Sequence, residues 1–149
     1  MPPAFVYFDL CNVLAFIDRH PVTGGEFFRL NVGMLPVVAA LERARVPLGL
    51  VSNITRDAWH HLLGLHWGIL PGRFRELVMS FEVGSVKPEP AFFAAAAARA
   101  GVDPARIFYV DDTVGHVSAA RAAGWDAEPF TSHLVLADAL ARRGLNLGL

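Results

Sequence analysis

Short apolar runs alternate five times with longer amphipathic segments along the chain, and this alternation limits the folds open to it. The runs are rich in β-branched and aromatic residues and predict strands, whereas the segments between them have helical periodicity. The expected strands are Ala4–Leu10, Pro47–Val51, Glu76–Phe81, Arg106–Val110 and Ala127–Phe130, and the expected helices are Met34–Arg45, Thr55–Leu65, Glu89–Ala100, Gly115–Ala123 and His133–Arg143. Strands that are apolar on both faces and alternate with helices predict a mostly parallel five-stranded sheet in an α/β fold.

Length and composition fit one domain over residues 1–149, with 54% hydrophobic and 18% charged residues. The net charge of −1, without a dense Lys/Arg block, argues against nucleic-acid binding. The longest stretch without charged residues, Ala58 to Gly72, is too short to span a bilayer, and the N-terminal residues lack the features of a signal peptide. We therefore expect no membrane association. A single cysteine, Cys11, fits a reducing compartment, so we expect a cytoplasmic location.

Polar side chains follow several of the predicted strands. They are Asp9, then Ser52 and Asn53, then Lys87, and then the pair Asp111 and Asp112. The carboxyl ends of parallel strands lie at one edge of the sheet, so we expect these side chains to converge there. Carboxylates suit a divalent cation, a hydroxyl and an ammonium suit a phosphoryl group, and an aspartate beside a metal can act as a nucleophile.

Each of these residues also has a simpler interpretation. Asp9 fits a turn cap, Ser52 fits a helix N-cap, and Lys87 fits a solvated loop. Asp111 and Asp112 are harder to explain in this way, because adjacent acids after the apolar run IFYV repel each other unless a cation or hydrogen-bond donors neutralise them. The combination of all these residues is what favours a site for a metal and a phosphoryl group.

Four segments together resemble, in order and spacing, the motifs of the haloacid dehalogenase-like hydrolase superfamily. They are FDLCNVL, VSN, VKPEPAFF and FYVDDTVGHVSAARAAGW. The first is most similar to the FDLGNV branch, which contains sugar-phosphate phosphatases. The resemblance implies a Rossmann-like three-layer sandwich and a Mg²⁺-dependent phosphohydrolase that works through an aspartyl-phosphate.

The resemblance also implies a role for each site residue. Asp9 corresponds to the nucleophile, Ser52 with its neighbour Asn53 to the phosphate-binding segment, and Lys87 to the residue that stabilises charge. Asp111 and Asp112 correspond to the acids that hold Mg²⁺, and the backbone carbonyl of Cys11 corresponds to the third protein ligand. The expected partner is a phosphorylated substrate, either a small molecule or a macromolecule.

Two positions depart from the family pattern. Cys11 stands where most phosphatases of this superfamily have a second aspartate, the general acid and base. A thiol, with an ordinary pKa of about 8.5, is a poor general base for water at neutral pH, so slow or lost turnover is expected. Alternatively, only the carbonyl of Cys11 is used and its sulfur is inert. His116 replaces a frequent asparagine and is expected either to orient Asp112 or to open its helix.

This sequence also has no room for the helical cap domain that some relatives insert after the first motif. The segment after the first motif has room only for a hairpin flap, with strands Ala15–Ile17 and Glu26–Leu30 and a turn supplied by Gly24 and Gly25. An open site suits a macromolecular substrate, or a neighbouring subunit that acts as the lid in a homodimer. The main alternative function is a binding domain that retains the metal and phosphate sites but has little catalysis. A haloacid dehalogenase is less favoured. Such an enzyme needs no metal, so no cation would neutralise the pair Asp111 and Asp112.

Overall fold

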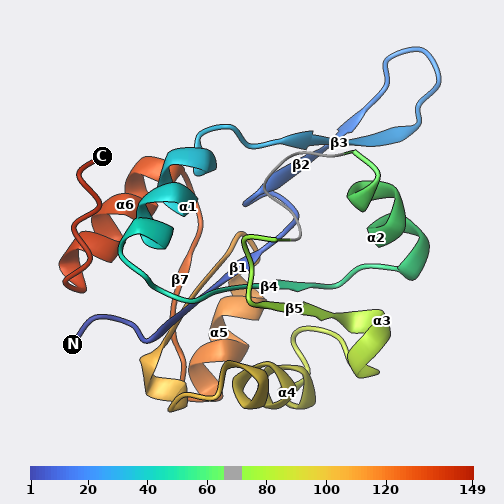
Figure 1. Ribbon diagram of the computed structural model, residues 1–149. Helices are drawn as coiled ribbons and strands as arrows, with labels where there is room; N and C mark the ends of the chain where they lie inside the picture. The colour runs from blue at the N-terminus through green and yellow to red at the C-terminus, as the bar shows by residue number, and fades with distance from the viewer. Residues whose placement is uncertain (66–71) are drawn as a thin grey trace.

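A five-stranded parallel sheet forms the centre of the computed structural model, which describes residues 1–65 and 72–149 (Figure 1). Its strands, in chain order, are β1 (Phe5–Asp9), β4 (Leu48–Ser52), β5 (Glu76–Met79), β6 (Ile107–Asp111) and β7 (Asp126–Pro129). They lie in the spatial order β5-β4-β1-β6-β7, and every neighbouring pair is parallel. The first strand is therefore central, between β4 and β6.

Six helices connect or follow the strands in the described part of the chain. They are α1 (Met34–Arg43), α2 (Arg56–Leu63), α3 (Ser80–Val83), α4 (Pro90–Ala100), α5 (Val114–Ala122) and α6 (His133–Arg142), with a 3-10 turn at Pro104–Arg106. Local chemistry sets their ends. The Thr55 hydroxyl accepts a hydrogen bond from the Ala58 N–H at 3.2 Å and begins α2. Gly101 adopts a left-handed φ of 69° and ends α4.

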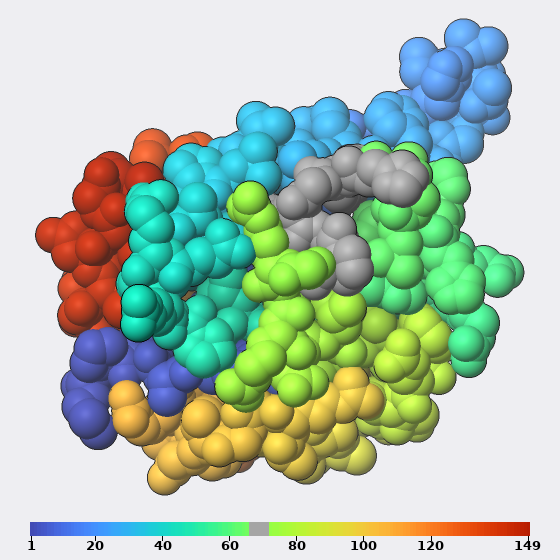
Figure 2. Space-filling model, in the orientation of Figure 1, coloured from blue at the N-terminus to red at the C-terminus, as the bar shows by residue number. Residues whose placement is uncertain are grey.

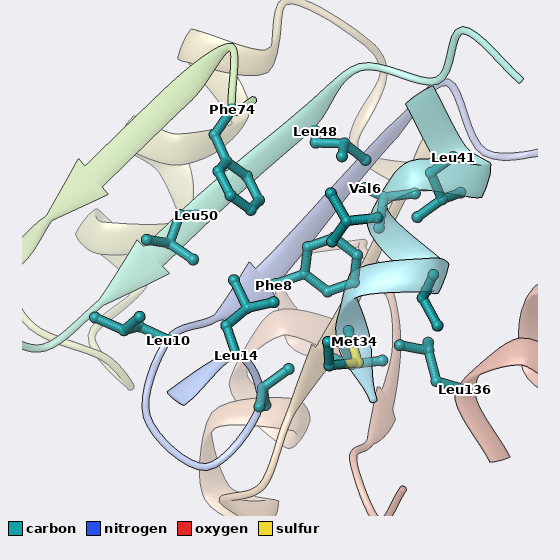
Figure 3. Packing of buried hydrophobic residues seen from close by; sticks show 14 of the residues in the cluster. Val6, Phe8, Leu10, Leu14, Met34, Leu41, Leu48, Leu50, Phe74 and Leu136 are labelled. Atoms are coloured by element: carbon teal, nitrogen blue, oxygen red, sulfur yellow. The ribbon is translucent and has the colours of Figure 1, made fainter. Parts of the chain in front are cut away.

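Alternate residues of β1 point to opposite faces of the sheet, and each face has its own apolar core. Val6 and Phe8 face a cluster that includes residues of α1, α2 and α6, part of which is shown in Figure 3. Phe5 and Tyr7 face a second cluster built with residues of α4 and α5. Gly49 of β4 makes room for the second cluster, because a Cβ there would lie 2.2 Å from the Tyr7 ring. The three-layer α/β architecture predicted from the sequence is confirmed.

One predicted strand is wrong at its carboxyl end. Glu76–Phe81 was expected to be extended, but the strand ends at Met79, and Ser80 and Phe81 belong to α3. The Ser80 hydroxyl accepts a hydrogen bond from the Ile54 N–H at 3.0 Å and donates one to the Ile54 carbonyl at 3.1 Å. These contacts to the loop after β4 hold the chain where it turns out of the sheet.

The predicted hairpin is present as β2 (Ala15–Arg19) and β3 (Glu26–Leu30), an antiparallel pair that projects from the body (Figures 1 and 2). Its first strand is two residues longer than predicted, and Gly24 in the turn has a φ of 69°. No helix within residues 1–65 and 72–149 is long and apolar enough to cross a membrane. The uncharged stretch from Ala58 to Gly72 lies partly outside the described residues.

Candidate active site

The carboxyl edge of the sheet brings the predicted residues together. Asp9, Ser52 and Asp111 end the three adjacent strands β1, β4 and β6. One carboxylate oxygen from each of Asp9, Asp111 and Asp112 lies within 4.8 Å of the other two. Convergence of the acids at this edge is therefore observed, as the sequence indicated.

Lys87 reaches this cluster from the loop before α4 and is only 3% exposed. Its Nζ lies 2.8 Å from Asp9 Oδ1 and 2.9 Å from Asp111 Oδ2. The same ammonium donates to the Tyr109 hydroxyl at 3.2 Å and has a longer contact of 3.5 Å with the Val51 carbonyl. The simpler interpretation of Lys87 as a solvated loop lysine is wrong, because its ammonium is buried and contacts the carboxyl groups of Asp9 and Asp111.

Asn53 holds the loop that carries Lys87. Its side-chain oxygen accepts from the Lys87 N–H at 2.8 Å, and its side-chain amide donates to the Lys87 carbonyl at 2.9 Å. The peptide bond between Lys87 and Pro88 is cis. Both ends of the Asn53 amide are thus engaged with backbone, whereas the resemblance had placed this residue in the phosphate-binding segment.

Asp111 is completely buried and accepts hydrogen bonds from four residues. The Thr113 N–H donates to Oδ1 at 2.8 Å, while Lys87, the Tyr109 hydroxyl and His116 Nδ1, the last at 3.1 Å, all contact Oδ2. Burial opposes the charged form, but Lys87, the Tyr109 hydroxyl and the Thr113 N–H outweigh it and lower the pKa of Asp111 below its ordinary value.

Two neighbours of Asp111, His116 and Tyr109, differ from what the sequence predicted. His116 is the third residue of α5 and contacts Asp111, so the expectation that it orients Asp112 is wrong. Tyr109 was missed. Its position two residues before Asp111 in a strand places both side chains on one face of the sheet, which is a signal that sequence patterns contain.

Asp9 has two differently placed carboxylate oxygens. Oδ1 accepts from Lys87 and from the Leu10 N–H at 2.9 Å, and within the described residues no hydrogen bond ends on Oδ2. Burial raises the pKa of Asp9 to about 8, with Lys87 acting in the opposite direction and Asp111 adding to the rise. A carboxylate in this environment gains from any additional positive charge placed beside it.

Ser52 is 1% exposed, and its Oγ has no hydrogen-bond partner within the described part of the chain. The interpretation of Ser52 as a helix cap is wrong, because Thr55 caps α2. Leaving a buried hydroxyl unpaired costs about 1–3 kcal/mol, so such a group at a sheet edge indicates a position where a ligand or water completes its bonding.

Asp112 and Cys11 line the more open side of the cluster. Asp112 is exposed and accepts a hydrogen bond at 2.9 Å from the side-chain amide of Asn12, a residue with a left-handed φ of 64° that sequence reasoning did not select. Cys11 is half-buried. Burial, followed by the charge of Asp9, raises the pKa of the Cys11 thiol to about 11. Its sulfur is therefore an even weaker acid than an ordinary cysteine.

Comparison with known proteins identifies the family. Residues 13–124 match the haloacid dehalogenase-like hydrolases, and the chain belongs to this family. It is also 35% identical over 103 residues to a glyceraldehyde 3-phosphate phosphatase from Methanopyrus kandleri. That match covers 67% of this chain, and the chain spans 42% of the length of that relative.

Solved structures share the fold. A haloacid dehalogenase-family hydrolase from Deinococcus radiodurans R1, with bound phosphate and sodium, has a TM-score of 0.76 at 21% identity, and 97% of each chain is covered. An enzyme of the same family from Bacteroides thetaiotaomicron, in complex with magnesium and inorganic phosphate, has a TM-score of 0.72 at 17% identity. That match covers 86% of this chain and 94% of the other. At these identities the likeness establishes the fold.

Proposed function

We propose that the protein is a Mg²⁺-dependent phosphohydrolase that forms an aspartyl-phosphate on Asp9. The observation that carries this proposal is the group of three carboxylates, within 4.8 Å of one another, placed around the buried ammonium of Lys87. A relative named as a phosphatase and a solved family member that holds magnesium and inorganic phosphate support it.

The donor set fits Mg²⁺, a cation that prefers oxygen ligands. Asp9 Oδ2 accepts no hydrogen bond from the described residues, and Asp112 is exposed, so both have oxygens available to a cation. Asp111 already accepts four hydrogen bonds, so we expect it to hold Lys87 in place and not to bind the metal directly. We assign the metal to Asp9, Asp112 and the backbone carbonyl of Cys11. Bound Mg²⁺ supplies positive charge that keeps Asp9 ionised and offsets charge on the phosphoryl oxygens.

The phosphoryl group in this proposal is held by Ser52 and Lys87. The unpaired Ser52 hydroxyl provides one hydrogen bond, and the Lys87 ammonium provides a charge-assisted one by giving up one of its present acceptors. A carboxylate oxygen of Asp9 then attacks phosphorus, and the bond from phosphorus to the leaving oxygen breaks with its electron pair going to the leaving group. Attack of water on phosphorus releases inorganic phosphate and restores the Asp9 carboxylate.

Cys11 determines which half of this reaction is slow. With a pKa raised to about 11, its thiol stays protonated at neutral pH and cannot take a proton from water. Aryl and acyl phosphates release stable anions that need no proton donor, so their first step survives. Hydrolysis of the aspartyl-phosphate becomes limiting, and the phosphorylated protein accumulates.

The decisive experiment measures Mg²⁺-dependent release of phosphate from acetyl phosphate by the wild type and by Cys11→Asp. Restoring a carboxylate acid and base is expected to raise turnover about 10²–10⁴-fold. Asp9→Asn is the inactive control, and mass spectrometry of the quenched wild type should show one added phosphoryl group. A Cys11→Asp protein that is folded, binds Mg²⁺ and turns over no phosphate ester or acyl phosphate contradicts the catalytic proposal.

The second candidate is a binding domain that retains the metal and phosphate sites without turnover. The raised pKa of the Cys11 thiol, at the position of the usual acid and base, is the observation that favours it. This function predicts Mg²⁺-dependent binding of inorganic phosphate by the wild type, with no turnover and no phosphorylated protein. Calorimetry and quenched-flow mass spectrometry on the same preparation separate the two candidates.

A further inference from the structure

A pocket of about 250 Å³ lies between the β2–β3 hairpin and α2. Its walls are formed by Ile17, Glu26, Phe27 and Phe28 from the hairpin and by Ala58 and His61 from α2. We propose that this pocket receives the leaving group of the substrate and that this group is apolar and about the size of one aromatic ring. The inference rests on the proposed phosphohydrolase function and specifies its substrate class.

Both walls of the pocket begin at the candidate active site. Ala15, the first residue of β2, forms a backbone bridge with Cys11, and its carbonyl accepts a hydrogen bond from the Asn12 N–H at 2.6 Å. The other wall, α2, begins directly after Thr55, two residues beyond Asn53. Figure 1 shows the hairpin and α2 on the side toward which the carboxyl ends of β4 and β5 point. The proposal places a substituent on a phosphoryl group at Asp9 between these two elements.

The hairpin side of the pocket offers apolar surface. Ile17 is 42% exposed and lines the pocket. Ile17 and Phe28 are cross-strand partners and share one face of the hairpin. Ala58 and His61 are three residues apart on α2 and share one face of that helix. The two faces close around the space without filling it.

The lining of the pocket disfavours a second anionic group on the substrate. Among the described residues that line it there is no lysine or arginine, and the carboxylate among them is that of Glu26, which pairs with Arg19 at 3.8 Å. A leaving group that carries another phosphate or a carboxylate would find no lysine or arginine among these lining residues to pair with it. A sugar-like group would leave most of its hydroxyls facing apolar side chains without hydrogen-bond partners.

The size of the pocket favours a single ring. A cavity of about 150 Å³ with apolar walls is large enough to bind benzene, whereas pockets for drug-sized ligands span about 300–1,000 Å³. The observed 250 Å³ lies between these values. A neutral aryl group fits both the volume and the lining.

The test compares two acyl phosphates that both leave as carboxylates and so place the same demand on the missing proton donor. Benzoyl phosphate carries a ring, and acetyl phosphate carries a methyl group. Burial of roughly 60 Å² of additional apolar surface predicts about tenfold higher kcat/KM for benzoyl phosphate. Binding of phenylphosphonate and methylphosphonate, measured by calorimetry with Mg²⁺ present, gives the same comparison without turnover.

Variants locate the preference. Ala58→Phe fills the pocket and Ile17→Ala removes one wall, and each is expected to reduce the benzoyl-to-acetyl ratio of kcat/KM to near 1 while kcat/KM for acetyl phosphate stays within about twofold. Val22→Ala is the matched control, since Val22 lies in the same hairpin, is 86% exposed and does not line the pocket. This control should keep the wild-type ratio.

The outcomes distinguish the pocket from the proposed function. If neither acyl phosphate is hydrolysed but phenylphosphonate binds more tightly than methylphosphonate, and Ala58→Phe removes the difference, the hydrolase proposal fails and the pocket assignment stands. Hydrolysis of both acyl phosphates with equal kcat/KM overturns the pocket assignment alone. Equal binding of the two phosphonates, or a ring preference that both variants leave intact, also overturns it.

Discussion

Replacing Asp9 by Asn is expected to remove most of the pH dependence of stability of the metal-free protein between pH 5 and pH 8. Burial raises the pKa of Asp9 to about 8 in the folded protein, whereas the ordinary value is 3.8. Between these values the folded state holds one proton more than the unfolded state, so the free energy of unfolding falls as pH rises. The contribution of this group is fully present below about pH 4 and lost by about pH 8.

The slope for one proton is about 1.4 kcal/mol per pH unit, which gives a loss of about 4 kcal/mol between pH 5 and pH 8. For a chain of 149 residues, each kcal/mol corresponds to about 2–4 °C in Tm, so the expected decrease is roughly 10 °C. Asn in place of Asp9 keeps the shape of the side chain and removes the titration. Lys87 retains Asp111 and Tyr109 as partners in that variant.

Urea unfolding followed by tryptophan fluorescence, in chelator at pH 5, 6, 7 and 8, measures the effect. The chain also has six histidines, so the difference between wild type and variant is the quantity to compare. Asp138→Asn is the control, because Asp138 carries an exposed carboxylate on α6. Saturating Mg²⁺ should restore stability to the wild type at pH 8 and have little effect on Asp9→Asn. Equal slopes for wild type and Asp9→Asn would refute the reasoning.

Three further predictions concern neighbouring side chains. Lys87→Ala should weaken binding of a beryllium fluoride phosphate analogue by about 1.5–3 kcal/mol, and Ser52→Ala by less; calorimetric affinities unchanged in both variants would move the phosphate site elsewhere. Tyr109→Phe should lower the free energy of unfolding in urea by about 1–2 kcal/mol, and a fully stable variant contradicts its bridging contacts. The rate of Cys11 alkylation by iodoacetamide should keep rising toward about pH 11 in the folded protein, whereas a plateau near pH 9 contradicts the raised pKa.

The fold and the edge of the sheet that carries the site were predictable because they depend on periodicity and order along the chain. A polar residue at the end of an apolar strand lies at the carboxyl edge of a parallel sheet. On this basis the sequence correctly predicted that Asp9, Ser52 and Asp111 lie together. Lys87 comes from a loop. Its position in the sequence did not show whether the ammonium points to solvent or into the cluster, because that depends on how the loop is anchored to Asn53.

Tertiary contacts explain the remaining errors. The strand at Glu76 was predicted too long because Ser80 and Phe81 continue an apolar pattern, and the bonds of Ser80 to Ile54 are invisible in local sequence. Of the two roles expected for His116, orienting Asp112 or opening its helix, the first is wrong because its ring contacts Asp111, and adjacent residues of an acid pair point in different directions. The pKa of the Cys11 thiol depends on burial and on Asp9, which a sequence pattern does not report.

The four hydrogen bonds that converge on Asp111 also bear on how this site tolerates sequence change. If either Tyr109 or His116 is lost, the carboxylate keeps Lys87, the Thr113 N–H and the other donor. If both are lost, a fully buried charge depends on the Thr113 N–H and on one ammonium that the phosphate also needs. Substitutions at these two positions should therefore be strongly epistatic, with a double variant much worse than the sum of two mild single ones. We expect substitution of Tyr109 to be tolerated only while His116 is retained, and substitution of His116 only while Tyr109 is retained.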